Sequence, residues 1–339
     1  MKVLFGSYQA ISILEGGVKT QVFALKTELE KLGVEVCLFN SWENISLRDY
    51  HCTHLFCAHI GTYHLARAIS VLAGKIVLTP TVFSRRHPNF IKFSLPAVKL
   101  AAKLGGFHHY YIVSELCEQA KFIAPNTRAE GNLIHQAFGV PLNKIKILPN
   151  GVDERFYFSD PDLFINKYGI KDFILYVGHI GWPRKNLLRF LEAVRNFDVP
   201  VVLIGKILDN EYAKKCLKLI KNRPKTIVIS DLDYANPILA SAYAACDTFI
   251  LPSYYETPGL SALEAGLAGA KVVITQFGGT KEYFKEYAHY INPYSVSSIR
   301  KTLEEALNKK KNSLLQNHIR QNYLWQKSAK VLIDIYKSI

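Results

Sequence analysis

Two glutamates eight residues apart are the residues of this chain best suited to bind a ligand and act on it. Glu256 lies in a loop, 252–258, that follows the short apolar run 248–251. Glu264 lies among small apolar residues, 259–269, whose composition predicts a helix. A carboxylate on so apolar a helix requires a partner or a ligand, because burying an unpaired charge costs free energy. The pair therefore marks a candidate site.

The start of this helix is a candidate anion site. The backbone N–H groups of Thr257, Gly259 and Leu260 can hold a phosphate or diphosphate there, and the helix dipole favours negative charge. Pro258 has no N–H to offer but presets the entry into the helix. A second apolar run, 271–275, predicts the next strand. Ligands of open α/β sheets bind where such strands end.

The sequence 251–279, LPSYYETPGLSALEAGLAGAKVVITQFGG, resembles the donor-binding motif of the retaining GT-B glycosyltransferases of family 4. The resemblance implies an α/β GT-B fold, with two Rossmann-like, doubly wound parallel-sheet domains facing a central cleft. It implies that Glu256 lies beside the transferred sugar and that Glu264 binds the ribose of a nucleotide-sugar. The implied enzyme is a metal-independent hexosyltransferase whose nucleotide-sugar is a substrate, with no separate cofactor.

Two other interpretations of the glutamate pair remain. In the first interpretation, Glu256 is an ordinary solvated loop carboxylate. In the second, the pair is the acid and nucleophile of a glycosidase. Eight residues of helix rise about 12 Å, whereas a retaining glycosidase needs about 5 Å between its carboxyl groups. The intervening Pro-Gly weakens this argument without removing it.

The resemblance also assigns cations to the diphosphate. In family 4, the loop after the first strand of the second domain supplies an Arg just after its Gly and a Lys at the next helix start. Here Lys185 matches the Lys, His179 stands where the Arg is common, and Arg184 supplies the missing charge. Glu256, Lys185 and Arg184 are thus the expected catalytic residues. The alternative is a solvated helix start, although the helix dipole disfavours cations there.

Two further donor contacts follow from the resemblance. Gly16 and Gly17, after the first strand, are expected to border the donor phosphates, unless they form a simple turn. The residues from Asp231 to Tyr234 are expected to contact the nucleotide base. Asp231-Leu232-Asp233 has the spelling of a metal-binding motif, but it falls in this base-contacting region. We therefore expect no metal site.

The acceptor side departs from the family pattern. Many members carry an active-site His where this chain has Thr81, and His59, Arg85 and Arg86 are candidate substitutes. These departures keep open an alternative function: a catalytically degenerate GT-B protein that binds a nucleotide-sugar or glycan as a regulatory or scaffold module.

A basic amphipathic segment, 89–106, alternates large apolar residues with Lys92, Lys99 and Lys103. We expect it to be broken or kinked at Pro96. One interpretation is docking on an anionic membrane surface, which suits a lipid-linked or cell-envelope glycan acceptor. The other is a helix that covers the sheet edge with its lysines extended to solvent.

The apolar runs predict the elements that position these residues. A domain of residues 1–165, completed by a terminal helix at about 320–339, is expected to hold the acceptor, and residues 166–319 the donor. One long helix is expected over about 313–338. Strands are expected at 2–6, 34–39, 54–58, 76–78, 121–125, 173–177, 200–205, 226–230, 248–251 and 271–275.

Composition excludes several function classes. No segment reaches the roughly 18 apolar residues of a membrane span, and the six scattered cysteines and the lack of a signal-peptide pattern indicate a cytoplasmic protein. Peripheral attachment to the inner face of the membrane fits the basic segment. A net charge of +14 favours acidic partners or is a solvated surface. Nucleic-acid-binding and nicotinamide-binding motifs are absent.

Overall fold

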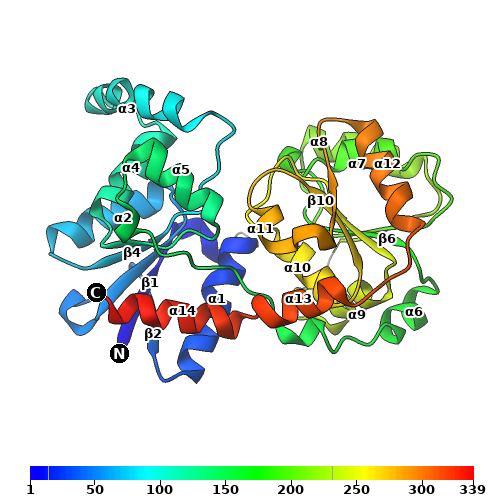
Figure 1. Cartoon of the computed structure of the whole chain (residues 1–339), viewed down its shortest axis with the longest axis horizontal. Helices are drawn as coiled ribbons and strands as arrows, with labels where there is room; N and C mark the ends of the chain where they lie inside the picture. Colours follow the sequence, from blue (N-terminus) through cyan, green and yellow to red (C-terminus); the bar gives the residue numbers. More distant parts are fainter. Residues whose placement is uncertain (14, 231) are drawn as a thin grey trace. The chain divides into compact units, whose positions relative to one another are not determined.

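The computed structural model of the chain describes residues 1–13, 15–230 and 232–339 (Figure 1). These residues form two compact units. The N-terminal unit contains Met1–Gly151 and Trp325–Ile339, and the C-terminal unit contains Val152–Leu324. The sequence placed the first boundary after residue 165 and the return to the first domain at about residue 320. Each unit is a parallel sheet with flanking helices, which is the predicted fold class.

The N-terminal unit is built on five parallel strands in the order β2-β1-β3-β4-β5. From β1 the chain moves first to β2 on one side and then to β3, β4 and β5 on the other. Right-handed crossovers therefore put the connecting helices on opposite faces. The strands are β1 (Lys2–Gly6), β2 (Glu35–Leu38), β3 (Cys52–Phe56), β4 (Ile76–Thr79) and β5 (Phe122–Ile123).

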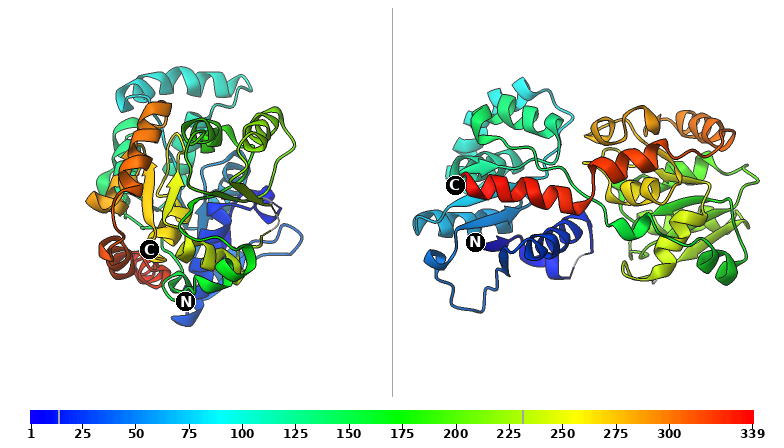
Figure 2. Two further views of the ribbon diagram at one scale, coloured as in Figure 1. Left: turned by 90° about the vertical axis from the view of Figure 1, so that its right-hand side faces the viewer. Right: turned by 60° about the horizontal axis from the view of Figure 1, so that its bottom comes forward.

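The helices of this unit pack in two groups. The terminal helix α14 lies beside α1 (Figures 1 and 2), and α4 packs against α2, α3 and α5. The helices are α1 (Gly17–Lys31), α2 (Ile60–Val71), α3 (Pro88–Lys103), α4 (His109–Gln119), α5 (Arg128–Phe138) and α14 (Trp325–Lys337).

The C-terminal unit has six parallel strands in the order β11-β10-β9-β6-β7-β8. The strand order reverses between β6 and β9, which makes this pair the topological switch point of the sheet. The strands are β6 (Ile174–Val177), β7 (Val201–Ile204), β8 (Thr226–Ile229), β9 (Thr248–Leu251), β10 (Lys271–Thr275) and β11 (His289–Ile291).

Helices cover both faces of the second sheet. One group joins α12 and α8 to α7, and another joins α13 and α9 to α10, with α6 on α9. The helices are α6 (Asp162–Tyr168), α7 (Leu187–Ala193), α8 (Glu211–Lys221), α9 (Pro237–Ala245), α10 (Leu260–Leu267), α11 (Thr280–Phe284), α12 (Val296–Leu307) and α13 (Leu314–Asn322).

The prediction of a single terminal helix is wrong, because the structure has two helices there, α13 and α14, separated at Tyr323. The Val152 N–H donates to the Tyr323 carbonyl at 2.7 Å, which diverts that carbonyl from the helix. On the other side of the division, a side chain at Gly151 would lie 2.5 Å from the Trp325 Cα. The two segments that link the units thus run against each other, and only glycine fits at residue 151.

The segment that was expected to be broken or kinked at Pro96 is not broken there. Helix α3 continues through Pro96 to Lys103. Proline removes one backbone N–H, so the carbonyl of Lys92 loses its partner within the helix. Both residues lie on exposed surface, where water can bind that carbonyl.

A buried histidine fixes α14 to the N-terminal sheet. His54, on β3, is fully buried, and its Nδ1 lies 2.6 Å from the Tyr336 hydroxyl of α14. Its Nε2 lies 2.9 Å from the Thr79 hydroxyl on β4. Burial lowers the pKa of His54 to about 3. The neutral imidazole is therefore the form that the fold accommodates.

This histidine predicts a loss of stability in acid. The unfolded chain takes up the His54 proton below about pH 6.5 and the folded chain only near pH 3, so its contribution is complete above pH 6.5 and declines as the pH falls. The free energy of unfolding of the N-terminal unit should drop by about 1.4 kcal/mol per pH unit in that window. Urea denaturation between pH 8 and pH 4 measures it.

His54→Gln should flatten this dependence, whereas His64→Gln, at an exposed position, should leave it unchanged. Equal slopes in the wild type and in His54→Gln would contradict the assignment.

Candidate active site

The backbone of Glu256 is held by the turn that follows β10. The Glu256 N–H donates to the Phe277 carbonyl at 3.2 Å, and the Gly279 N–H donates to the Glu256 carbonyl at 2.9 Å. Gly278 has a φ of +96°, and a Cβ there would lie 2.0 Å from the Glu256 carbonyl oxygen. The Gly-Gly turn is therefore required for the loop after β9 to approach this closely.

Three side chains converge on one carboxylate oxygen of Glu256. Its Oε1 lies 2.7 Å from the Lys185 ammonium, 2.6 Å from the Ser253 hydroxyl and 3.5 Å from the Arg184 guanidinium. Glu256 is only 6% exposed. Lys185 and Arg184 follow β6 and Glu256 follows β9, so the cluster sits at the switch point of the C-terminal sheet.

Burial and charge act against each other in this cluster. Burial alone would raise the pKa of Glu256, but Lys185 and Arg184 outweigh it, and the pKa of Glu256 lies below its ordinary value. Burial lowers the pKa of Lys185, and the attraction of Glu256 offsets this only in part. The Glu256 carboxylate is thus held in its ionised form, and the Lys185 ammonium lies beside it.

Hydrogen bonds to backbone carbonyls join the two loops that carry these charges. The Asn186 side-chain amide donates to the carbonyls of Pro252, at 3.0 Å, and Pro293, at 2.7 Å. Asn186 is buried with a left-handed φ of 56°, which ends the short helical turn Pro183–Lys185. The Tyr254 N–H donates to the Arg184 carbonyl at 2.9 Å. These bonds set the positions of Lys185 and Arg184.

Glu264 lies on α10, where it is 5% exposed. The Tyr243 hydroxyl of α9 donates to its Oε2 at 2.7 Å. Burial raises the pKa of Glu264, and hydrogen bonds from the Tyr243 and Tyr234 hydroxyls offset part of that rise. Tyr234 precedes α9, so the predicted base-contacting loop and the predicted ribose carboxylate are directly connected.

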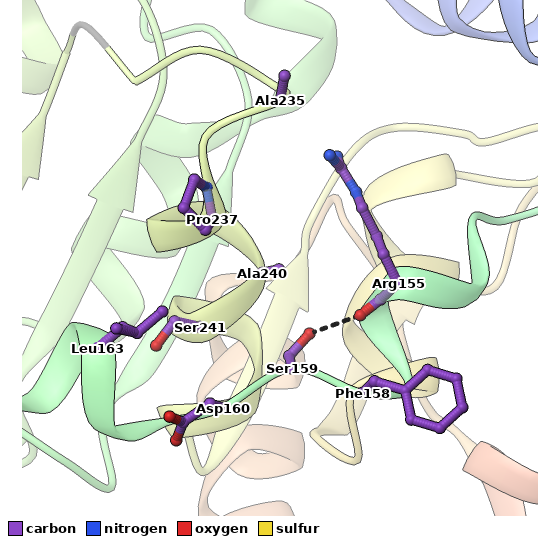
Figure 3. Close-up of a pocket in the computed structure, with 9 residues that line it drawn as sticks. All are labelled: Arg155, Phe158, Ser159, Asp160, Leu163, Ala235, Pro237, Ala240 and Ser241. Carbon is purple, nitrogen blue, oxygen red and sulfur yellow. Dashed lines mark hydrogen bonds between the residues drawn. The ribbon is translucent and has the colours of Figure 1, made fainter.

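Arg155 supports Tyr234 from the other side. Its guanidinium donates to the Tyr234 carbonyl at 2.7 Å and lies 4.6 Å from the centre of the Tyr234 ring. Arg155 also lines a pocket of about 280 Å³ beside the start of α9 (Figure 3), together with Phe158, Ser159, Asp160, Leu163, Ala235, Pro237, Ala240 and Ser241.

The predicted anion site at the start of α10 has the expected backbone form. Gly259 caps the helix with a φ of 96° and, having no side chain, makes no side-chain cap hydrogen bond. Thr257 and Pro258 precede it through a cis peptide bond, and Leu260 is the first helical residue. A Cβ on Gly259 would lie 3.4 Å from the Glu256 Cγ, so this helix start is next to the carboxylate cluster.

The remaining donor candidates stay predictions. His179 lies in the loop after β6, with its ring 5.2 Å from that of Trp182. Gly16 caps α1 and Gly17 begins it, without a side-chain cap. Asp231 lies outside the described residues.

The acceptor candidates lie at the carboxyl edge of the N-terminal sheet. Thr81, after β4, has a left-handed φ of 55°, a strained conformation for a β-branched residue. Its hydroxyl oxygen is buried without a hydrogen-bond partner in the described part of the chain. His59 caps α2 by accepting the Gly61 N–H. Arg85 and Arg86 are exposed in the loop before α3.

Several residues of this site escaped the sequence analysis. Ser253 and Asn186 orient the charged cluster, and Tyr243 and Arg155 orient the Glu264 network. Ser253 was detectable from its place in the LPS that opens the motif. The other three come from segments distant in sequence, with nothing local to indicate their partners.

In the residues that the structure describes, no group of three or more histidine, cysteine, aspartate or glutamate side chains is arranged to hold a metal ion.

Comparisons with known proteins agree with this arrangement. Residues 163–325, just under half of the chain, match the family model described as glycosyl transferases group 1. An uncharacterized glycosyltransferase of Methanocaldococcus jannaschii is 24% identical over 218 residues, which is 59% of this chain and 55% of that protein. The chain thus spans about half the length of this relative.

Two solved structures share the fold over almost their whole length. Sucrose-phosphate synthase from Thermosynechococcus elongatus has a TM-score of 0.79 at 13% identity, covering 99% of this chain and 98% of that chain. HepE from Anabaena, in complex with UDP and glucose, has a TM-score of 0.73 at 18% identity and covers 100% of both. The two units therefore have the GT-B fold. Together with the family match, they support a glycosyltransferase.

The buried ion pair predicts a characteristic mutational pattern. Glu256→Gln removes the partner of a cation that is largely buried, and should lower the free energy of unfolding of the C-terminal unit by about 3 kcal/mol. Adding Lys185→Met to Glu256→Gln should recover part of that loss, because no unpaired ammonium remains. Urea denaturation of the single and double variants measures both effects.

Glu211→Gln, in the exposed pair Lys214–Glu211, is the matched control and should change stability little. A double variant as unstable as the sum of its singles would show that the two charges do not interact.

Proposed function

We propose that this protein is a retaining glycosyltransferase of family 4 that moves a hexose from a nucleotide-sugar to a hydroxyl of a glycan or lipid-linked acceptor. The observation that carries the proposal is the convergence of Lys185 and Arg184 on Glu256 at the switch point of the C-terminal sheet. A nucleotide-sugar brings a diphosphate for the cations and a sugar whose hydroxyls the carboxylate can accept.

The reaction exchanges two bonds at the anomeric carbon. The bond to the diphosphate oxygen breaks, the acceptor oxygen bonds to the same face, and the acceptor proton leaves with the diphosphate. Lys185 and Arg184, joined by the N–H groups at the start of α10, stabilise the negative charge that develops on the leaving group. Glu256 orients the sugar.

Nucleotide recognition is assigned to Glu264. The Tyr243 and Tyr234 hydroxyls both bind this carboxylate, and an ionised carboxylate has about four lone-pair sites, so capacity remains to accept the ribose hydroxyls. Tyr234, bound to the same carboxylate and to Arg155, connects this acceptor to the loop expected to contact the base.

Helix α3 supports docking on a membrane surface. Phe90, Phe93, Leu100 and Leu104 recur at spacings of three, seven and four residues, which are spacings of one helix face, and between 52% and 83% of each is exposed. Ile91, on another side, is fully buried. Lys92 and Lys103 are exposed, and Lys99 pairs with Glu118 at 2.6 Å. A helix with an exposed apolar stripe and adjacent lysines binds an anionic interface well.

In the described residues, no helix combines the length and apolar character needed to cross a membrane.

Donor binding is tested first by thermal shift against UDP, UDP-glucose and the other common nucleotide-sugars. A ligand that binds the folded state at 100 times its Kd should stabilise the protein by about 2.7 kcal/mol. Glu264→Gln should weaken nucleotide binding about tenfold, since a ribose hydroxyl loses its charged acceptor. Glu256→Gln should cut turnover far more than nucleotide affinity.

Glu211→Gln again serves as the control that should change neither quantity. Absence of any nucleotide-induced shift would refute the donor site. Nucleotide binding without turnover of any donor would instead favour the degenerate GT-B protein, which the Thr81 and His179 substitutions motivate.

Membrane docking is tested by sedimentation with vesicles. The wild type should bind vesicles containing phosphatidylglycerol more strongly than neutral phosphatidylcholine vesicles, because each lysine at such a surface contributes about 1 kcal/mol. Lys92→Gln/Lys103→Gln and Phe93→Ala/Leu104→Ala should each reduce binding about tenfold.

The exposed pair Val71 and Leu72, at the end of α2, gives the control Val71→Ala/Leu72→Ala. Equal loss in this control, or no binding by the wild type, would reject α3 as the docking surface.

A further inference from the structure

A long stretch of the N-terminal unit carries no acidic residue. Residues 50–114 include seven of the eleven histidines and seven lysines and arginines, but no Asp or Glu. With 28 Asp and Glu among 339 residues, about five would be expected in a stretch of this length. Positive charge gathered on one part of a protein attracts anionic ligands.

Loops from this stretch meet at the switch point of the N-terminal sheet, between β1 and β3. The Ser7 hydroxyl after β1 donates to the Phe56 carbonyl of β3 at 2.8 Å. The ring of Tyr8 lies 4.9 Å from that of His59. Parallel α/β sheets bind ligands at this kind of position.

Histidines cap the helices that begin at this edge. His59 Nδ1 accepts the Gly61 N–H at 3.2 Å at the start of α2, and His108 Nδ1 accepts the Tyr110 N–H at 3.1 Å at the start of α4. A neutral histidine whose Nδ1 accepts carries its proton on Nε2. Each cap therefore offers one N–H donor at the positive end of a helix dipole.

A third histidine joins the two capping residues. The ring of Phe107, next to His108, lies 6.4 Å from that of Tyr63, one turn beyond His59 in α2, so the starts of the two helices lie close together. Loss of hydration, and then His108 and His59, lowers the pKa of His109. The loop with Arg85 and Arg86 reaches the start of α4, because the Ser84 hydroxyl lies 3.2 Å from the Tyr110 hydroxyl, and the Arg86 guanidinium lies 4.7 Å from the centre of the Phe90 ring.

A buried carboxylate holds this loop in position. Glu130 is 3% exposed and accepts the Val82 N–H at 2.6 Å and the Asn126 N–H at 2.8 Å. Both of its oxygens thus bind backbone next to the strained Thr81. The Glu130 carboxylate is therefore hydrogen-bonded inside the fold, whereas Arg85 and Arg86, which follow Val82, are exposed.

We propose that His59, His108 and His109, with Arg85 and Arg86, form a binding site for the phosphate group of the acceptor. The inference rests on the proposed function, since it names the chemical class of the second substrate. The shared ligand chemistry is a phosphate ester, either on a soluble sugar or on a prenyl lipid.

The test measures the Kd of glucose 6-phosphate and of farnesyl phosphate for the full chain by calorimetry. His59→Asn/His108→Asn is the informative variant, because asparagine still caps the two helices but lacks the Nε2 donors. Its Kd for both phosphates should rise about tenfold or more, while its Kd for the nucleotide diphosphate stays unchanged.

Two controls separate this site from others. Lys75→Gln lies in the same acid-free stretch but at the amino edge of β4, and should not change phosphate binding. Lys185→Gln reports whether the phosphate occupies the donor site instead. Tighter binding of farnesyl phosphate would support the site and a lipid acceptor, whereas tighter binding of glucose 6-phosphate would support the site and a soluble acceptor.

Phosphate affinity that falls only in Lys185→Gln, or that is unchanged in His59→Asn/His108→Asn, would overturn the inference. If the wild type binds a nucleotide-sugar but neither phosphate, the inference fails and the proposed function stands. If it binds none of these ligands, both fail.

Discussion

The ion pair between Glu256 and Lys185 is the interaction on which the C-terminal unit's site depends. Two opposite charges can be buried together only where their geometry is good and their remaining hydrogen bonds are satisfied. This requirement brings the loop after β6 against the loop after β9, where Asn186 donates to the Pro252 carbonyl, and Gly278 lets the turn after β10 pack closely against Glu256. Under the proposed function, a diphosphate would meet a Lys185 ammonium that is already largely buried, so little further reorganisation would be needed.

The sequence predicted the parts of this arrangement that are encoded locally. Strands and helices came from apolar runs, Glu256 and Glu264 came from a short motif with a recognisable spacing, and Lys185 came from the resemblance of a second loop. Contacts between distant segments could not be predicted. Tyr243 meets Glu264 only because α9 and α10 pack together, and beyond the end of α13 the Tyr323 carbonyl accepts the Val152 N–H. Neither fact leaves a pattern in its own segment.

The N-terminal unit shows the same limit in another form. The sequence identified Thr81 only because it stands where the family 4 pattern has a histidine, whereas the structure shows a strained backbone, a buried hydroxyl and a loop anchored by Glu130. Helix-capping histidines are equally hard to recognise from sequence, since serine, threonine, aspartate and asparagine are the usual caps. The carboxyl edge of this sheet is therefore defined by contacts that the sequence did not reveal.

The return of the chain to its first unit has a consequence for folding during synthesis. Domains usually fold in order as the chain leaves the ribosome. Here the N-terminal sheet lacks α14, and with it the Tyr336 partner of His54, until the chain has passed through the C-terminal unit. The C-terminal unit, which is continuous in sequence, can therefore complete its core first. The N-terminal unit starts earlier but is completed later, and until then it exposes apolar surface that a chaperone would recognise.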